Sequence, residues 1–177
     1  VGRLDHQKRP DLLLAAFAHL VGQVADTKIH LVMVGTGRLE AELHQMGDAL
    51  GIADKISWLG EQDGASLMPS FDVVAVPSGY EGFPYVVSEA LRAGTPVVAS
   101  TQVPTESFGP APTGVTVADA ERPAAFAQAL ATALDDLSAR AEIRRTQEPF
   151  TIDAMARATV ESYRTLLHRS TTPEPAR

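Results

Sequence analysis

The feature that most constrains this fold is the alternation of short apolar runs with longer segments of helical pattern. The apolar runs, each rich in Val, Ile or Leu, cover residues 29–34, 56–60, 72–77, 96–100 and 114–117. Apolar runs without polar alternation are typical of strands buried on both faces, as in a parallel sheet covered by helices. With a strand end at Val1-Gly2, the pattern predicts an α/β domain with a parallel sheet of about six strands and helices on both faces.

The segments between these runs carry helix signals. The first helix is expected to have Pro10 near its first turn and to place Leu13, Phe17 and Leu20 on one face. Further helices are predicted over residues 38–50, 84–93, 123–137 and 152–167, with a short helix or turn over 64–69.

Composition narrows the classes of function. The length of 177 residues suits one domain, and we expect it over residues 1–169 with a polar tail over 170–177. The formal net charge of −7 argues against non-specific binding to nucleic acid or to an anionic membrane. The chain has no cysteine, which excludes disulfides, thiolate metal sites and a cysteine nucleophile. Because the lack of cysteine leaves the redox compartment unconstrained, we expect a cytoplasmic location as the default. No apolar run approaches the roughly 18 residues of a membrane span.

Ligands of parallel α/β sheets bind beyond the carboxyl ends of the strands, which selects the loops to search. These loops are residues 2–9, 35–38, 60–64, 78–84 and 100–107. In the loop 78–84, Pro84 fits the first turn of a helix, whose free amides and dipole form an anion site. Gly82 beside it lets a ligand approach the backbone closely.

Two acids, Glu81 and Glu89, bracket this anion site along the chain. Carboxylates repel phosphate but accept hydrogen bonds from hydroxyl groups, so the order acid, anion site, acid suits a sugar, a diphosphate and a ribose. The alternative, that both are ordinary helix acids facing solvent, stays open on spacing alone.

Basic side chains stand on the first loop. Arg3 and Lys8 follow the strand end at Val1-Gly2 and can reach the same edge of the sheet, where they would neutralise a diphosphate. Arg9 belongs to the same basic cluster. A basic surface loop without function is the competing interpretation.

The loop after the second apolar run, Gly35-Thr36-Gly37, has only two of the three glycines of a dinucleotide fingerprint, since Glu40 stands at the third position. A tight turn is the simpler interpretation, and close approach to a ligand is the other. The chain has no D-x-D motif and its histidines are scattered without metal-ligand spacing, so no metal-dependent mechanism is indicated.

One long motif resembles the signature of family 4 glycosyltransferases. Its centre is the pair Glu81-x7-Glu89. The motif begins with Pro77-Ser78-x2-Glu81-Gly82-Phe83-Pro84 and continues with Glu89-Ala90-Leu91-x-Ala93-Gly94-x-Pro96-Val97-Val98-Ala99. Val1-Gly2-Arg3-Leu4 with Lys8, Val34-Gly35-x-Gly37 and Leu59-Gly60 also stand in the order that this family shows. The resemblance covers nearly the whole chain.

The resemblance implies one half of a GT-B fold, the Rossmann-like domain that binds a UDP- or GDP-sugar in a retaining enzyme without a metal or other cofactor. In this reading Arg3 and Lys8 hold the diphosphate and offset charge on the leaving group. Glu81 orients the donor sugar, and Glu89 holds the ribose hydroxyls.

The resemblance also implies backbone contacts. Gly82 and Phe83 would orient the sugar, and the helix amides near Tyr85 and Val86 would meet phosphate. The loop at Gly60 and Glu61 would border the base.

The family's first domain, which supplies acceptor contacts, has no counterpart in these residues. We therefore expect weak nucleotide binding and no transfer by this chain alone, and any peripheral contact with the inner membrane would run through that partner domain. The leading alternative is a non-catalytic module that binds a nucleotide or nucleotide sugar and regulates a partner. An oxidoreductase domain is disfavoured by Glu40, and a GT-B epimerase lacks the motif around Glu81.

Overall fold

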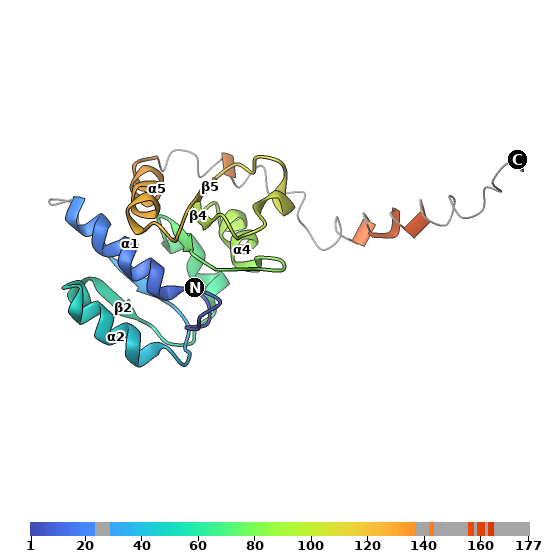
Figure 1. Cartoon of the computed structure of the whole chain (residues 1–177). Coiled ribbons are helices and arrows are strands. Elements are labelled where there is room, and N and C mark those ends of the chain that lie inside the picture. Colours follow the sequence, from blue (N-terminus) through green and yellow to red (C-terminus); the bar gives the residue numbers. More distant parts are fainter. Residues whose placement is uncertain (24–28, 137–141, 144–155, 158, 162, 165–177) are drawn as a thin grey trace, which may run out of the picture.

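The structure is a computed structural model that describes residues 1–23, 29–136, 142–143, 156–157, 159–161 and 163–164. Strands and helices alternate along it as the apolar pattern predicts (Figure 1). The order is α1 (Pro10–Gln23), β1 (Leu31–Met33), α2 (Glu40–Ala49), η1 (Ala53–Lys55), β2 (Ile56–Trp58), α3 (Gly64–Leu67), η2 (Met68–Ser70), β3 (Val74–Val76), α4 (Tyr85–Ala93), β4 (Val97–Ser100), η3 (Thr105–Phe108), β5 (Val115–Ala118) and α5 (Pro123–Asp135). The helix predicted over 152–167 and the tail over 170–177 fall largely or wholly outside the described residues.

The strands are all parallel, but they form two sheets. β1 pairs with β2, and β3, β4 and β5 pair in that order. The prediction of one sheet of about six strands is therefore wrong in strand number and in continuity for the described residues. Val1-Gly2 is not part of a strand, although the Gly2 N–H donates to the Val34 carbonyl at 2.9 Å. The sheet is interrupted because β1 and β3 do not pair with each other, and neighbouring strands of one sheet must be joined by backbone hydrogen bonds.

Helices cover both faces of the larger sheet. Strand β4 is apolar because both of its faces are buried under helices. Val98 belongs to the core cluster that contains Leu14 of α1 and Phe126 of α5. Val97 and Ala99 belong to the other cluster, which includes Val87 and Leu91 of α4. Because successive strand residues point to opposite faces, β4 is buried on both sides. The core thus lies on both faces of β4, the strand that has a neighbouring strand at each edge.

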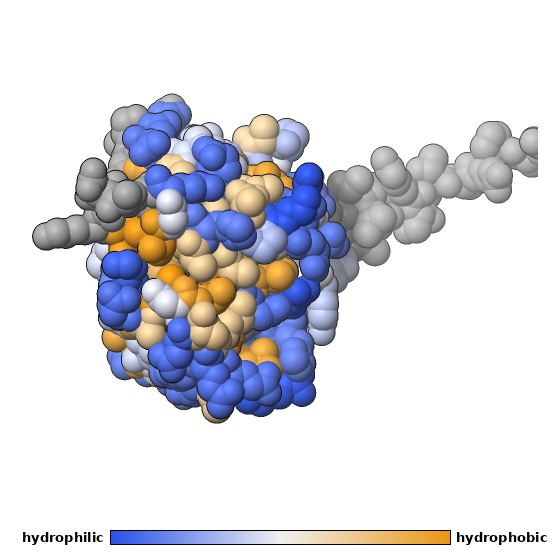
Figure 2. All heavy atoms as spheres, turned by 60° about the vertical axis from the view of Figure 1, so that its left-hand side comes forward, coloured by the Kyte–Doolittle hydropathy of each residue, from blue (hydrophilic) through white to orange (hydrophobic). Residues whose placement is uncertain are grey.

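Apolar surface is also left outside the core. Figure 2 shows apolar atoms gathered in the middle of one face, surrounded by hydrophilic ones. Several large apolar residues are exposed near the carboxyl ends of the strands, among them Tyr80, Phe83 and Tyr85. In the part of the chain that the structure describes, no helix is long and apolar enough to cross a membrane.

Candidate functional site

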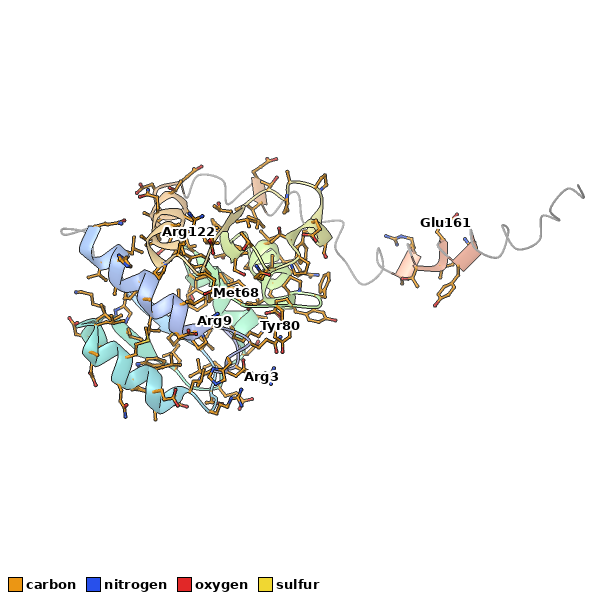
Figure 3. All side chains as sticks on the ribbon, viewed as in Figure 1. Arg3, Arg9, Met68, Tyr80, Arg122 and Glu161 are labelled. Atoms are coloured by element: carbon orange, nitrogen blue, oxygen red, sulfur yellow. The ribbon has the colours of Figure 1, made fainter. Side chains whose placement is uncertain are left out.

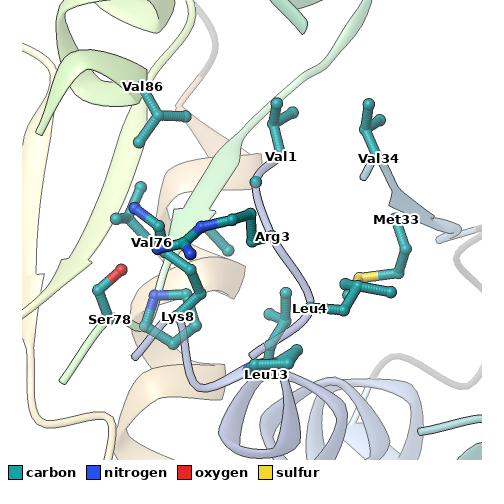
Figure 4. Close-up of a pocket in the computed structure, with 14 residues that line it drawn as sticks. Val1, Arg3, Leu4, Lys8, Leu13, Met33, Val34, Val76, Ser78 and Val86 are labelled. Carbon is teal, nitrogen blue, oxygen red and sulfur yellow. The ribbon is translucent and has the colours of Figure 1, made fainter. Parts of the chain in front are cut away.

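The predicted basic residues and the start of α4 meet at one cavity at the carboxyl ends of β1 and β3. Arg3, Lys8, Ser78 and Val86 all line it (Figure 4). Its volume is about 40 Å³, little more than the share of one water molecule in the liquid. A ligand of nucleotide size would therefore lie across the mouth of this cavity and over the surrounding loops.

A short contact of the site joins two predicted residues from distant parts of the chain. The Lys8 Nζ donates to Glu81 Oε1 at 2.6 Å. The Glu81 side chain is 7% exposed and that of Lys8 is 27% exposed, so the pair is largely shielded from water. A charge-assisted hydrogen bond in such surroundings is short and strong, and it fixes both groups in place.

Gln7 joins the same two loops and was not singled out from the sequence. Its carbonyl accepts the Gly79 N–H at 2.8 Å, and its side-chain Nε2 donates to the Tyr80 carbonyl at 3.3 Å. Its Oε1 accepts from Arg3 Nη2 at 3.3 Å. Because these partners become neighbours only on folding, position between Arg3 and Lys8 is the one sequence signal that could have identified it.

The other two basic residues of the loop differ from Lys8. Arg3 is 70% exposed and lies 3.4 Å from an Asp5 carboxylate oxygen (Figure 3). Arg9 has a positive φ of 49° and pairs with Asp11 at 3.1 Å and with Glu121 at 2.7 Å. The hydrogen bond to Asp11, joined by the Glu121 contact, raises the pKa of the Arg9 guanidinium against a smaller effect of burial. Arg9 is thus committed to structural ion pairs, whereas Arg3 is available to a ligand.

The start of α4 has backbone donors to spare. Helix α4 begins at Tyr85 with buried Pro84 before it, one residue later than predicted. The Tyr85 N–H donates to the Phe83 carbonyl at 3.0 Å. No backbone acceptor among the described residues takes the N–H groups of Gly82, Phe83 or Val86. A Cβ added at Gly82 would meet no atom within 4 Å, so the space for close approach of a ligand exists.

Glu89 and Glu61 are not joined to the cluster around Lys8. Glu89 is half-buried in α4 and Glu61 is exposed after β2. The described residues offer no hydrogen bond or ion pair to either carboxylate. Both can therefore accept hydrogen bonds from an added ligand.

The glycines after β1 pack against the chain itself. Gly35 has φ 122°, and an added Cβ would collide with the Gly2 carbonyl. A Cβ at Gly37 would collide with the backbone of Leu4. The Gly35 N–H also donates to the Gly60 carbonyl at 2.6 Å. The tight-turn interpretation thus has a physical basis, since these glycines let the loop that carries Arg3 lie directly against them.

Comparison with known proteins identifies the family of this chain. Residues 1–148 match the family described as glycosyl transferases group 1. The chain belongs to this family. A D-inositol 3-phosphate glycosyltransferase of Rhodococcus jostii is 33% identical over 181 aligned positions, gaps included, and the match covers 93% of this chain and 39% of that protein. An uncharacterized glycosyltransferase of Methanocaldococcus jannaschii is 38% identical over 104 residues, which cover 57% of this chain and 26% of that protein.

Several solved protein structures share the fold of this chain. Alr3699/HepE of Anabaena, crystallised with UDP and glucose, matches with a TM-score of 0.77 and 23% identity over 93% of this chain and 47% of that one. Sucrose-phosphate synthase of Thermosynechococcus elongatus matches with a TM-score of 0.77 and 26% identity over 96% of this chain and 45% of that one. The chain thus spans less than half of these proteins and corresponds to one domain of a GT-B structure.

Proposed function

We propose that this chain binds the nucleotide-sugar donor, a UDP- or GDP-sugar, of a retaining glycosyltransferase that needs no metal. The observation that carries the proposal is the Lys8–Glu81 pair at 2.6 Å, which lies at a cavity shared with Arg3 and the start of α4. A cation, free helix amides and a carboxylate at one edge suit a ligand that combines a diphosphate with sugar hydroxyls.

The cations act on the leaving group. During transfer the bond between the anomeric carbon and the diphosphate oxygen breaks, and that oxygen takes the electron pair. Lys8 and Arg3 offset the charge that develops there, which lowers the barrier. An ammonium carries three N–H donors, so Lys8 can reach a phosphate oxygen while it still donates to Glu81.

The acids and amides place the rest of the donor. The N–H groups of Gly82, Phe83 and Val86 face the ligand, with Pro84 and Tyr85 shaping the helix start. Glu81 accepts from donor-sugar hydroxyls, and Glu89 accepts from the ribose. Gly60 and Glu61 border the base, and Gly35 and Gly37 support that edge.

The acceptor is contacted by another part of the enzyme. The relatives are longer than this chain, which covers 39% of the Rhodococcus protein. We therefore propose that the chain binds donor but transfers sugar only when paired with an acceptor-binding domain. A non-catalytic nucleotide-binding module would use the same site.

Calorimetric titration of the chain with UDP-, GDP- and ADP-sugars, and with NAD as a control, tests this function. We expect heat of binding for a UDP- or GDP-sugar in the absence of metal and none for NAD. Adding EDTA should leave the affinity unchanged. Binding of NAD alone, or binding that requires a divalent ion, contradicts the proposal.

A further inference from the structure

Arg9 has a backbone conformation that its residue type disfavours. Its φ is 49°, and among the residues that the structure describes it is the one residue other than glycine with a positive φ. The left-handed region strains a residue with a side chain, because Cβ then crowds a backbone carbonyl. Pro10 follows directly and restricts the residue before it further, toward extended conformations. Such a residue persists only where the surrounding structure holds it, and strained residues of this kind gather at functional sites.

Two acids hold the Arg9 side chain. Nε and Nη2 donate to the Asp11 carboxylate at 3.1 to 3.3 Å, and Nη1 donates to Glu121 Oε1 at 2.7 Å. Asp11 lies in the first turn of α1, whereas Glu121 lies between β5 and α5, 112 positions along the chain from Arg9. Because Glu121 is 67% exposed, water screens its pair and the stabilisation of the fold is small. The planar guanidinium is nevertheless fixed in direction, since both acids contact it at once.

The strained backbone of Arg9 connects these ion pairs to the donor site. Arg9 stands between Lys8 and α1, where the first loop enters the helix (Figure 3). Its carbonyl accepts from the Leu12 N–H at 3.2 Å and so belongs to the helix start. A Cβ added at Gly79 would lie 3.6 Å from Arg9 Cγ, so the stem of Arg9 packs against the loop that carries Glu81. A change of φ at residue 9 would therefore change the direction in which the chain joins Lys8 to the helix.

Lys8 has little freedom to absorb such a change. Its Nζ lies 2.6 Å from Glu81 Oε1, and its backbone N–H donates to the Asp5 carboxylate at 3.1 Å. Both ends of the lysine are thus bonded, and hydrogen bonds weaken steeply once distance and angle leave a narrow range. A shift of the loop at residue 9 would break the contact with Glu81 or carry the ammonium away from a diphosphate.

We infer that Arg9 is a positioning residue of the donor site. It forms an ionic latch, the pairs of Arg9 with Asp11 and with Glu121, that holds the backbone left-handed and thereby directs Lys8 at Glu81 and at the diphosphate. Arg9 itself does not touch the ligand, because the two acids already engage its guanidinium. The inference rests on the proposed function for the ligand, and it adds Glu121, which no sequence pattern connects with the first loop.

A pair of substitutions at Arg9 separates its backbone role from its charge. Arg9→Ala and Arg9→Gly both remove the guanidinium, but only glycine adopts a φ of 49° without strain. We expect Arg9→Ala to lower the affinity for UDP about fivefold or more and to leave that for uridine unchanged, whereas Arg9→Gly keeps the UDP affinity within about twofold. Calorimetry at a temperature where both variants are folded measures this. Equal losses would show that the charge itself binds the ligand, and no loss in either variant would show a role in stability alone; both results overturn the inference.

Glu121 provides the second test of the latch. Glu121→Gln keeps the size of the side chain and weakens the pair with Arg9. We expect it to lower the UDP affinity about two- to threefold in the otherwise unaltered chain and to have no effect in the Arg9→Gly chain, where the latch is already absent. Glu42→Gln, at an exposed acid of α2, is the matched control and should change neither affinity. An equal loss from Glu121→Gln in both backgrounds would contradict the latch.

Amide hydrogen exchange tests the latch without any ligand. The Gly79 N–H donates to the Gln7 carbonyl at 2.8 Å and reports on the contact between the two loops. Its exchange should be about fivefold or more faster in Arg9→Ala than in Arg9→Gly. If the unaltered chain binds neither UDP nor a nucleotide sugar, the proposed function fails while this difference in exchange still stands. Equal exchange in the two variants would overturn the latch even where UDP binds.

Discussion

Two cations of the first loop, Lys8 and Arg3, are equivalent in the sequence and different in the structure. Lys8 is 27% exposed and lies 2.6 Å from the shielded Glu81 carboxylate. Arg3 is 70% exposed and, among the described residues, has a 3.4 Å contact with Asp5 and a 3.3 Å hydrogen bond to Gln7. The site therefore has a fixed half at Lys8 and Glu81 and an adjustable half at Arg3.

The difference has energetic meaning. An exposed ion pair contributes little because water screens it and its side chains lose entropy. Removing one partner of a shielded pair leaves the other charge with poor compensation, which costs more. We infer that Lys8 contributes to both stability and ligand binding, whereas Arg3 contributes to ligand binding alone.

Lys8→Ala should have the largest effect, because it removes a phosphate contact and leaves Glu81 without its partner. We expect the affinity for UDP to fall about 10- to 100-fold while that for uridine changes little. Calorimetry with both ligands measures the difference. Lys55→Ala is the matched control, since Lys55 lies in η1, just before β2 begins at the opposite end of the sheet. Equal losses of affinity for UDP and uridine would contradict a contact between Lys8 and the diphosphate.

Glu81→Gln keeps the size of the side chain and removes its charge. We expect the free energy of unfolding to fall by about 1–2 kcal/mol, measured by urea denaturation. Any advantage of a UDP-sugar over UDP should shrink roughly tenfold, because a carboxylate that accepts sugar hydroxyls is gone. Glu61→Gln, at an exposed acid, serves as the control. An unchanged free energy of unfolding would show that the Lys8–Glu81 pair does not hold this half of the site in place.

Arg3→Ala should lower the affinity for UDP by about 3- to 5-fold. This loss is smaller than that expected for Lys8→Ala, because the exposed guanidinium is well solvated in the free protein. The thermal midpoint should not move, since the present contacts of Arg3 are weak. Arg92→Ala, in the last turn of α4, is the comparison variant. A drop in stability as large as that of Lys8→Ala would erase the contrast between the two halves.

Gln7→Ala should have the smallest effect, about a twofold loss of UDP affinity, because its side-chain hydrogen bonds are long and near the surface. The backbone bond from Gly79 to the Gln7 carbonyl stays. In the Arg3→Ala background the same substitution should cost less than in the unaltered chain, since Gln7 acts partly by holding Arg3. A full additive loss in the double variant would give Gln7 a separate role.

The sequence predicted that the loops of Lys8 and Glu81 lie at one edge, but it did not predict how the strands pair. Lys8 and Glu81 could be assigned to one edge because loops at the carboxyl ends of parallel strands converge, and the structure places them in contact. The helices that begin at Pro10 and just after Pro84 followed from proline and apolar spacing.

The remainder depended on tertiary pairing. Apolar runs show that β1 and β3 are buried strands but do not show which strand lies beside which, so the interruption of the sheet was not foreseen. Gln7 has no local signature, because its partners Gly79 and Tyr80 are distant in the chain. Arg9 was grouped with Arg3 and Lys8, yet its ion pair with Glu121 turns it to a structural task.

The most direct measurement is a titration of the ¹⁵N-labelled chain with UDP, followed by the backbone amide signals. The account predicts that Gly82, Phe83 and Val86 shift most, together with the loop around Lys8, and that Lys8→Ala abolishes these shifts. Shifts centred instead on residues 53–57, at the opposite end of the sheet, or shifts that survive Lys8→Ala unchanged, would contradict a donor site built on Lys8, Glu81 and the start of α4.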